Sequence, residues 1–65
     1  MSYEALLLEV NHLEGVGTRL EGLADMHPSL FEKLTGIAAS VRNAAALLAV
    51  LVMTATQVDK KPEIQ

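Results

Sequence analysis

The chain has 65 residues, no cysteine and a formal net charge of −3. A single chain of this size buries too little surface to be comfortably stable without disulfides, a metal or oligomerisation, and the lack of cysteine excludes disulfides and thiolate metal sites. The scattered basic residues form no stripe for phosphates, which disfavours nucleic-acid binding. Ala, Leu and Val carry most of the apolar half of the chain, which favours an all-α fold.

The first predicted helix covers about residues 2–26. A rival interpretation ends this helix near Gly15 and restarts it with Thr18 as the N-cap and Glu21 as its capping-box partner. The apolar residues along one face of this helix, its seam, keep the same helical spacing from start to end, which favours one continuous helix. Gly17 within the seam would allow a second helix to approach closely. The seam residues recur at alternating steps of three and four: Tyr3, Leu6, Val10, Leu13, Gly17, Leu20 and Ala24.

A boundary follows at His27, because Pro28 disfavours helical geometry in the residue before it. Ser29 and Glu32 then form a capping box that predicts a second helix over about residues 29–57. The short turn makes the two helices antiparallel neighbours, so that residues 1–58 form a hairpin domain and residues 59–65 a flexible tail. The seam of the second helix is predicted to contain Phe31, Leu34, Ala38, Val41, Ala45, Leu48, Val52 and Ala55.

The second helix is apolar on all sides in its central part, since every residue from 44 to 53 is apolar. Such a helix lies either in a membrane or inside a larger bundle. The uncharged run between Arg42 and Asp59 has sixteen residues, short of the roughly twenty that span a bilayer. We therefore expect a homodimeric four-helix bundle, and a membrane-associated protein that uses residues 43–58 is the alternative. The predicted subunit interface consists of Ala46, Leu47, Val50, Leu51 and Met53.

Glu9 and His12 are the only metal-like pair, because an E-x-x-H spacing brings a carboxylate and an imidazole onto one helix face. Di-iron bundles add further glutamates from the facing helices, whereas the facing level here offers Asn43 and alanines. The metal-binding bundle is therefore the weaker alternative, and no cofactor is predicted.

A turn centred between His27 and Pro28 would place Arg42 level with Glu14. We expect the stem of Arg42 to lie along the apolar face with its guanidinium in water, in preference to an ion pair with Glu14 or with Glu9 of a second copy. Asn43 is either a solvated residue or a group that sets the register of a subunit interface.

No serine is placed with a histidine and a carboxylate in a way that spacing alone supports, so we predict no catalytic residue and no enzyme activity. The amino-terminal stretch lacks the basic residues of a secretory signal, which makes the cytoplasm the expected compartment. The sequence thus predicts a non-enzymatic helical bundle that acts through self-association and protein contacts, as a regulatory or adaptor module.

Overall fold

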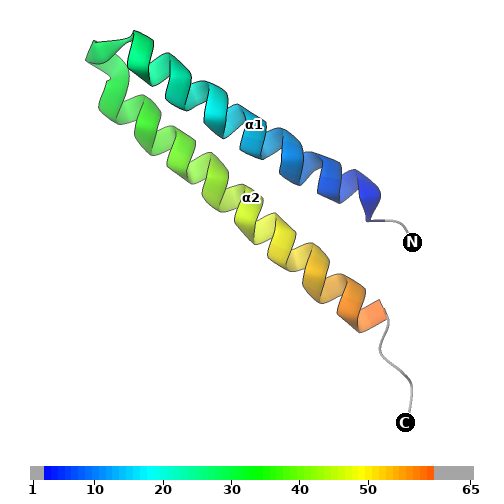
Figure 1. Cartoon of the computed structure of the whole chain (residues 1–65). Helices are drawn as coiled ribbons and strands as arrows, with labels where there is room; N and C mark the ends of the chain where they lie inside the picture. The colour runs from blue at the N-terminus through cyan, green and yellow to red at the C-terminus, as the bar shows by residue number, and fades with distance from the viewer. Residues whose placement is uncertain (1–2, 60–65) are drawn as a thin grey trace.

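The computed structural model describes residues 3–59, which form an antiparallel hairpin of two long helices (Figure 1). Helix α1 runs Glu4–Met26, the short 3-10 helix η1 covers Pro28–Leu30, and α2 runs Phe31–Asp59. Helix α2 extends past the start of α1 in Figure 1. The all-α hairpin is confirmed, while its pairing with a second copy stays a prediction. Of the predicted tail, residues 59–65, only Asp59 is described, and it still belongs to α2.

Helix α1 is continuous through Gly15 and Gly17, so the interpretation with a break before Thr18 is wrong. The hydroxyl of Thr18 donates to the carbonyl of Glu14, one turn earlier, at 3.2 Å. This bond is typical of a threonine inside a helix, whereas an N-cap would receive a bond from an amide further along the chain. The helix persists despite its glycines because its seam is packed against α2.

The turn begins where Pro28 predicts it, directly after Met26. The backbone N–H of His27 donates to the carbonyl of Ala24 at 3.2 Å, and its ring Nδ1 donates to the carbonyl of Leu23 at 2.9 Å. Carbonyls in the last turn of a helix lack partners within the helix. His27 therefore satisfies two of them and closes the end of α1.

The capping box at Ser29 is a wrong prediction. Ser29 lies inside η1, and its hydroxyl makes no hydrogen bond to any part of residues 3–59. The N–H of Leu30 donates to the carbonyl of His27 at 2.8 Å, and the N–H of Phe31 donates to the carbonyl of Pro28. The 3-10 turn thus supplies backbone acceptors at the position where a serine cap was expected.

The contact between the helices follows the two predicted seams, and each seam alternates between small and large residues. The small members are buried: Val10, Gly17 and Ala24 on α1, and Ala38, Ala45 and Val52 on α2. The leucine and valine members between them are half-buried: Leu6, Leu13 and Leu20 on α1, and Leu34, Val41 and Leu48 on α2. Small residues on the contact line let the helix axes approach, which leaves no room for the larger side chains between them.

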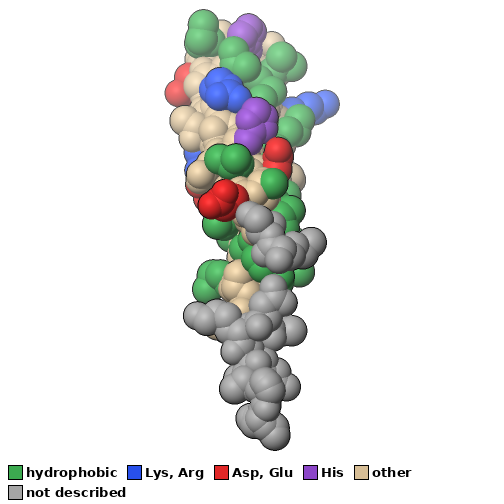
Figure 2. All heavy atoms as spheres, turned by 90° about the vertical axis from the view of Figure 1, so that its right-hand side faces the viewer, with side chains coloured by type: hydrophobic (Ala, Val, Ile, Leu, Met, Phe, Trp, Pro, Cys, Tyr) green, Lys and Arg blue, Asp and Glu red, His purple; other side chains and the backbone are tan. Residues whose placement is uncertain are grey.

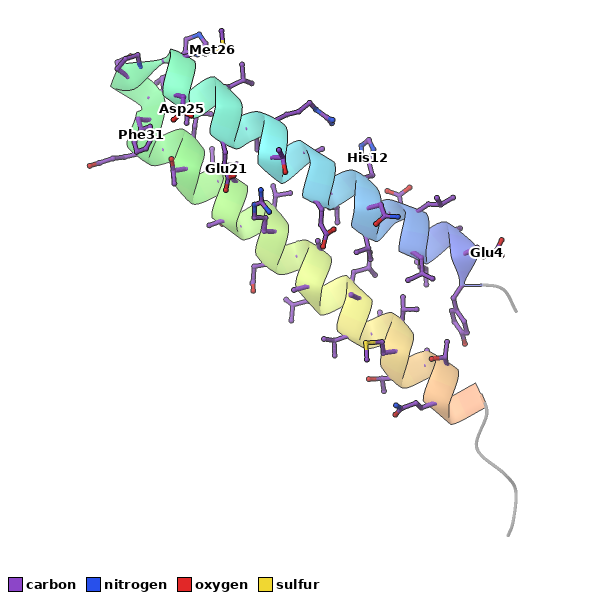
Figure 3. All side chains as sticks on the ribbon, in the orientation of Figure 1. Glu4, His12, Glu21, Asp25, Met26 and Phe31 are labelled. Carbon is purple, nitrogen blue, oxygen red and sulfur yellow. The ribbon has the colours of Figure 1, made fainter. Side chains whose placement is uncertain are left out.

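Phe31 is the seam residue that the prediction misplaces, since 45% of it is exposed. It is the first residue of α2 and lies at the turn, as Figure 3 shows. Helix α1 has already ended there, at Met26, so too little of it remains to cover an aromatic ring.

Gly17 marks a close approach of the two helices, as predicted. A Cβ at this position would lie 2.9 Å from Cγ of Arg42 and 3.6 Å from the backbone carbonyl oxygen of Ala38. Cγ belongs to the inner part of the arginine side chain, so the contact could be relieved only by moving the whole side chain. Gly22, on the same helix, has no such neighbour within 4 Å.

These two glycines give a matched pair of substitutions. Gly22→Ala should raise the free energy of unfolding by about 0.5–1 kcal/mol, because alanine favours the helix and meets nothing. Gly17→Ala should instead lower it, because an overpacked contact costs roughly 1–3 kcal/mol and outweighs the same gain in helix propensity. Urea unfolding of both variants at one protein concentration measures the difference. A Gly17→Ala protein as stable as Gly22→Ala would show that the helices are not in close contact there.

Candidate interaction surfaces of the hairpin

Arg42 connects the two helices on one side of the hairpin. Its Nε donates to Oε2 of Glu21 at 3.2 Å, and its Nη2 donates to Oε1 of Glu21 at 3.0 Å. Nη2 also donates to the hydroxyl of Thr18 at 3.0 Å. In Figure 3, Glu21 reaches from α1 toward α2. The pair is bidentate, which fixes the guanidinium in one plane.

The structure corrects two expectations about Arg42. It pairs with Glu21 and not with Glu14, which lies two helical turns earlier on α1, because a long helical side chain leans toward the N-terminus of its own helix, and for α2 that is toward the turn. The guanidinium is also held by defined partners, whereas the sequence favoured a solvated group. Both partners stay partly in water, with 42% of the arginine and 50% of the glutamate side chain exposed. An exposed pair of this kind contributes little stability, about 0–1 kcal/mol.

The half-buried seam residues lie on the side opposite to Arg42. Successive residues of an α-helix turn by about 100°, so Glu21 and Arg42 lie to one side of the contact line on their own helices. Leu20 and Val41, one position earlier, are rotated to the other side. Because Arg42 contacts Glu21, the two helices place their polar residues on the same side and their larger apolar residues on the opposite one.

We call this opposite surface the apolar side. Three residues after each of these larger apolar residues, the helix has turned further from the contact line, and the residue found there is apolar as well. On α1 the apolar side comprises Leu13, Val16, Leu20 and Leu23. On α2 it comprises Ile37, Val41, Ala44, Leu48 and Leu51. Each helix thus carries a wide apolar stripe, as helices inside a bundle do, and the hairpin covers only one edge of it.

All five residues of the predicted subunit interface are exposed in the hairpin. They surround α2, since Leu51 lies on the apolar side, while Ala46 and Met53 lie on the side of Arg42. Figure 2 shows hydrophobic side chains at the surface along the face that it draws, with charged side chains scattered between them. Within residues 3–59, large apolar side chains are exposed at Leu7, Leu8, Leu23, Met26, Leu30, Phe31, Ile37, Leu47, Val50, Leu51 and Met53.

The metal candidates Glu9 and His12 are both exposed on α1. His12 points away from α2 in Figure 3. Among residues 3–59, no three His, Cys, Asp or Glu side chains come together in a way that could hold a metal ion. Asn43 is exposed on α2, so the hairpin alone does not give it a partner in α1.

One helical stretch, Pro28–Gln57, is long and apolar enough to cross a membrane, with a mean hydropathy of 1.8 in its most apolar window. Only 17% of that window is buried in the hairpin. This stretch therefore meets the length and composition of a membrane span, although its uncharged run of sixteen residues is shorter than a typical one.

The described part of the chain contains no pocket or cleft. Comparison with protein-family models, curated protein sequences and solved structures gives no match. The candidate functional features of the described hairpin are two surfaces, namely the side that carries Arg42 and the apolar side.

The contact between Arg42 and Glu21 can be tested against a second acidic residue of α1. Glu21→Ala should lower the free energy of unfolding by at most about 1 kcal/mol at low salt, and the loss should shrink at high salt, because exposed ion pairs are screened. Glu14→Ala is the control, since the ion pair of Arg42 is with Glu21 and not with Glu14. Thermal unfolding of both variants at two ionic strengths gives the comparison. Equal losses for the two variants would mean that Arg42 has no preferred partner.

Proposed function

We propose that this chain is a non-enzymatic helical hairpin that self-associates into a homodimeric four-helix bundle and acts through protein contacts, as a regulatory or adaptor module. One observation carries the proposal. Among the residues whose burial the structure describes (3–57), the buried apolar ones are Val10, Ala24, Ala38, Ala45 and Val52, whereas the large apolar side chains stay half-buried or exposed.

The energetic argument concerns the size of the buried side chains. Burying a large apolar side chain fully contributes about 1.5–3 kcal/mol, and no large side chain among the described residues is fully buried. A chain of 65 residues already lacks surface to bury. Packing two hairpins together covers the larger side chains, and a symmetric dimer is the commonest way in which soluble chains achieve this.

The second candidate is a small membrane-associated protein, favoured by the apolar stretch Pro28–Gln57. Lipid would cover the same side chains. Against this, α2 contains Lys33 and Arg42 within the stretch, and a charged residue deep in a bilayer costs about 2.5 kcal/mol or more. The bidentate contact of Arg42 with Glu21 would also have to leave water.

Self-association predicts that stability depends on protein concentration. Because two copies combine on folding, the melting temperature should rise by about 3–8 °C for each tenfold increase in concentration. Circular dichroism melts over a hundredfold range, together with sedimentation equilibrium, measure both quantities. A melting temperature that is independent of concentration, with a monomer in the centrifuge, would overturn the proposal.

The cytoplasmic and membrane hypotheses separate on cell fractionation. We expect the expressed chain in the soluble fraction without detergent, because a dimer hides its apolar side chains from water. Recovery in a membrane pellet that resists an alkaline wash would favour the membrane candidate instead. A Leu48→Asp variant is the control for misfolding, since a carboxylate in the seam should send the chain to the aggregated fraction.

A further inference from the structure

We propose that the second copy packs against the apolar side in an antiparallel orientation, with Ala44 at the two-fold axis and Glu9 next to Arg19 of the second copy. This inference rests on the proposed self-association and specifies its surface and direction. It places Ala46 and Met53, two residues of the predicted interface, outside the contact.

The choice of side follows from what each side would bury. On the side of Arg42, a second copy would have to cover the bidentate contact with Glu21, and removing such a pair from water is unfavourable. On the opposite side, the stripe of α2 has the spacing 4-3-4-3 from Ile37 through Val41, Ala44 and Leu48 to Leu51. This is the heptad pattern of a helix that meets another helix along its length.

The symmetry of that stripe indicates that a second copy of the chain covers it. Ile37 and Leu51 lie seven residues before and after Ala44, and Val41 and Leu48 lie three before and four after. A two-fold axis at Ala44 therefore sets each half of the stripe against the other half in the second copy. The small side chain of Ala44 at the centre allows the two α2 helices to approach, as Gly17 does between α1 and α2.

The direction follows from charge. On α1, Glu9 lies in line with the apolar stripe, between Leu6 and Leu13, and it makes no ion pair within residues 3–59. Gly17 lies level with the segment from Ala38 to Arg42, which places Ala44 at about the level of residues 11–15 of α1.

A two-fold axis at this level brings Glu9 to within about one turn of Arg19 in the second copy, because the two α1 helices then run antiparallel. Arg19 is exposed and also makes no ion pair in the described part of the hairpin. The contact occurs twice in the dimer. If instead both turns lay at the same end, Glu9 would face Leu48 and Leu51 of the second copy and would be buried without a cation.

Single cysteines test the surface, because the chain contains none. The Ala44→Cys protein should form a disulfide-linked dimer nearly completely under mild oxidation, since the two side chains meet at the axis. The Ala46→Cys protein is the matched control: it alters an exposed alanine of the same helix, two residues away, and should remain largely unlinked. Circular dichroism checks that both remain helical.

Charge exchange tests the direction. Glu9→Arg alone and Arg19→Glu alone should each raise the dimer dissociation constant by about tenfold or more, and the double exchange should restore it to within a few-fold of the original. A double variant as weak as the two single effects combined would overturn the antiparallel arrangement. A dimer that links through Ala46→Cys and not through Ala44→Cys would overturn the chosen surface while leaving self-association intact. A wild-type monomer in the centrifuge would overturn both.

Discussion

The close approach of α1 and α2 at Gly17 determines the rest of the structure. A Cβ there would lie 2.9 Å from the Arg42 side chain, so the position accepts no side chain without displacing the arginine. Because buried alanines continue the same contact line, the helix axes are held near one another along the hairpin. Leu13 and Leu20 cannot enter that line and are turned outward instead. The small seam residues therefore lie at the contact between the helices, and the large ones lie along one side of the hairpin.

This arrangement explains why the two helices pair in one register and yet gain little stability from their contact. The seams fix the pairing of the helices and leave no polar side-chain atom buried without a partner among the described residues. They bury little apolar area, however, because valine and alanine offer little. The contact of Arg42 with Glu21 and Thr18 adds specificity to the register and little free energy. In a hairpin of this kind, contacts within the chain fix how the two helices pair, while most of the apolar surface stays exposed.

Much of the fold could be predicted from the sequence, because seam periodicity and a proline are strong local signals. The seam on α1 is confirmed at every position from Tyr3 to Ala24, and the end of α1 falls before His27 as expected. The errors arise where local chemistry competes with the turn. A capping box at Ser29 is plausible from spacing, yet the 3-10 turn uses backbone groups for the same purpose. The partner of Arg42 also differs from the expected one, because its side chain leans along α2 toward the turn and reaches Glu21, two helical turns beyond Glu14.

The two sides of the hairpin could not be distinguished from the sequence, for a geometric reason. Around α2 alone, Ala44 and Ala46 are both apolar and symmetric about the seam residue Ala45, so helix periodicity treats them alike. They become different only when the contact of Arg42 with Glu21 shows which flank of α2 belongs with the polar flank of α1. The remaining flank then joins the leucines of both helices into one surface. Glu9 interrupts that surface at one end; it is exposed in the hairpin, and a second copy packed against this surface would have to supply a cation for it.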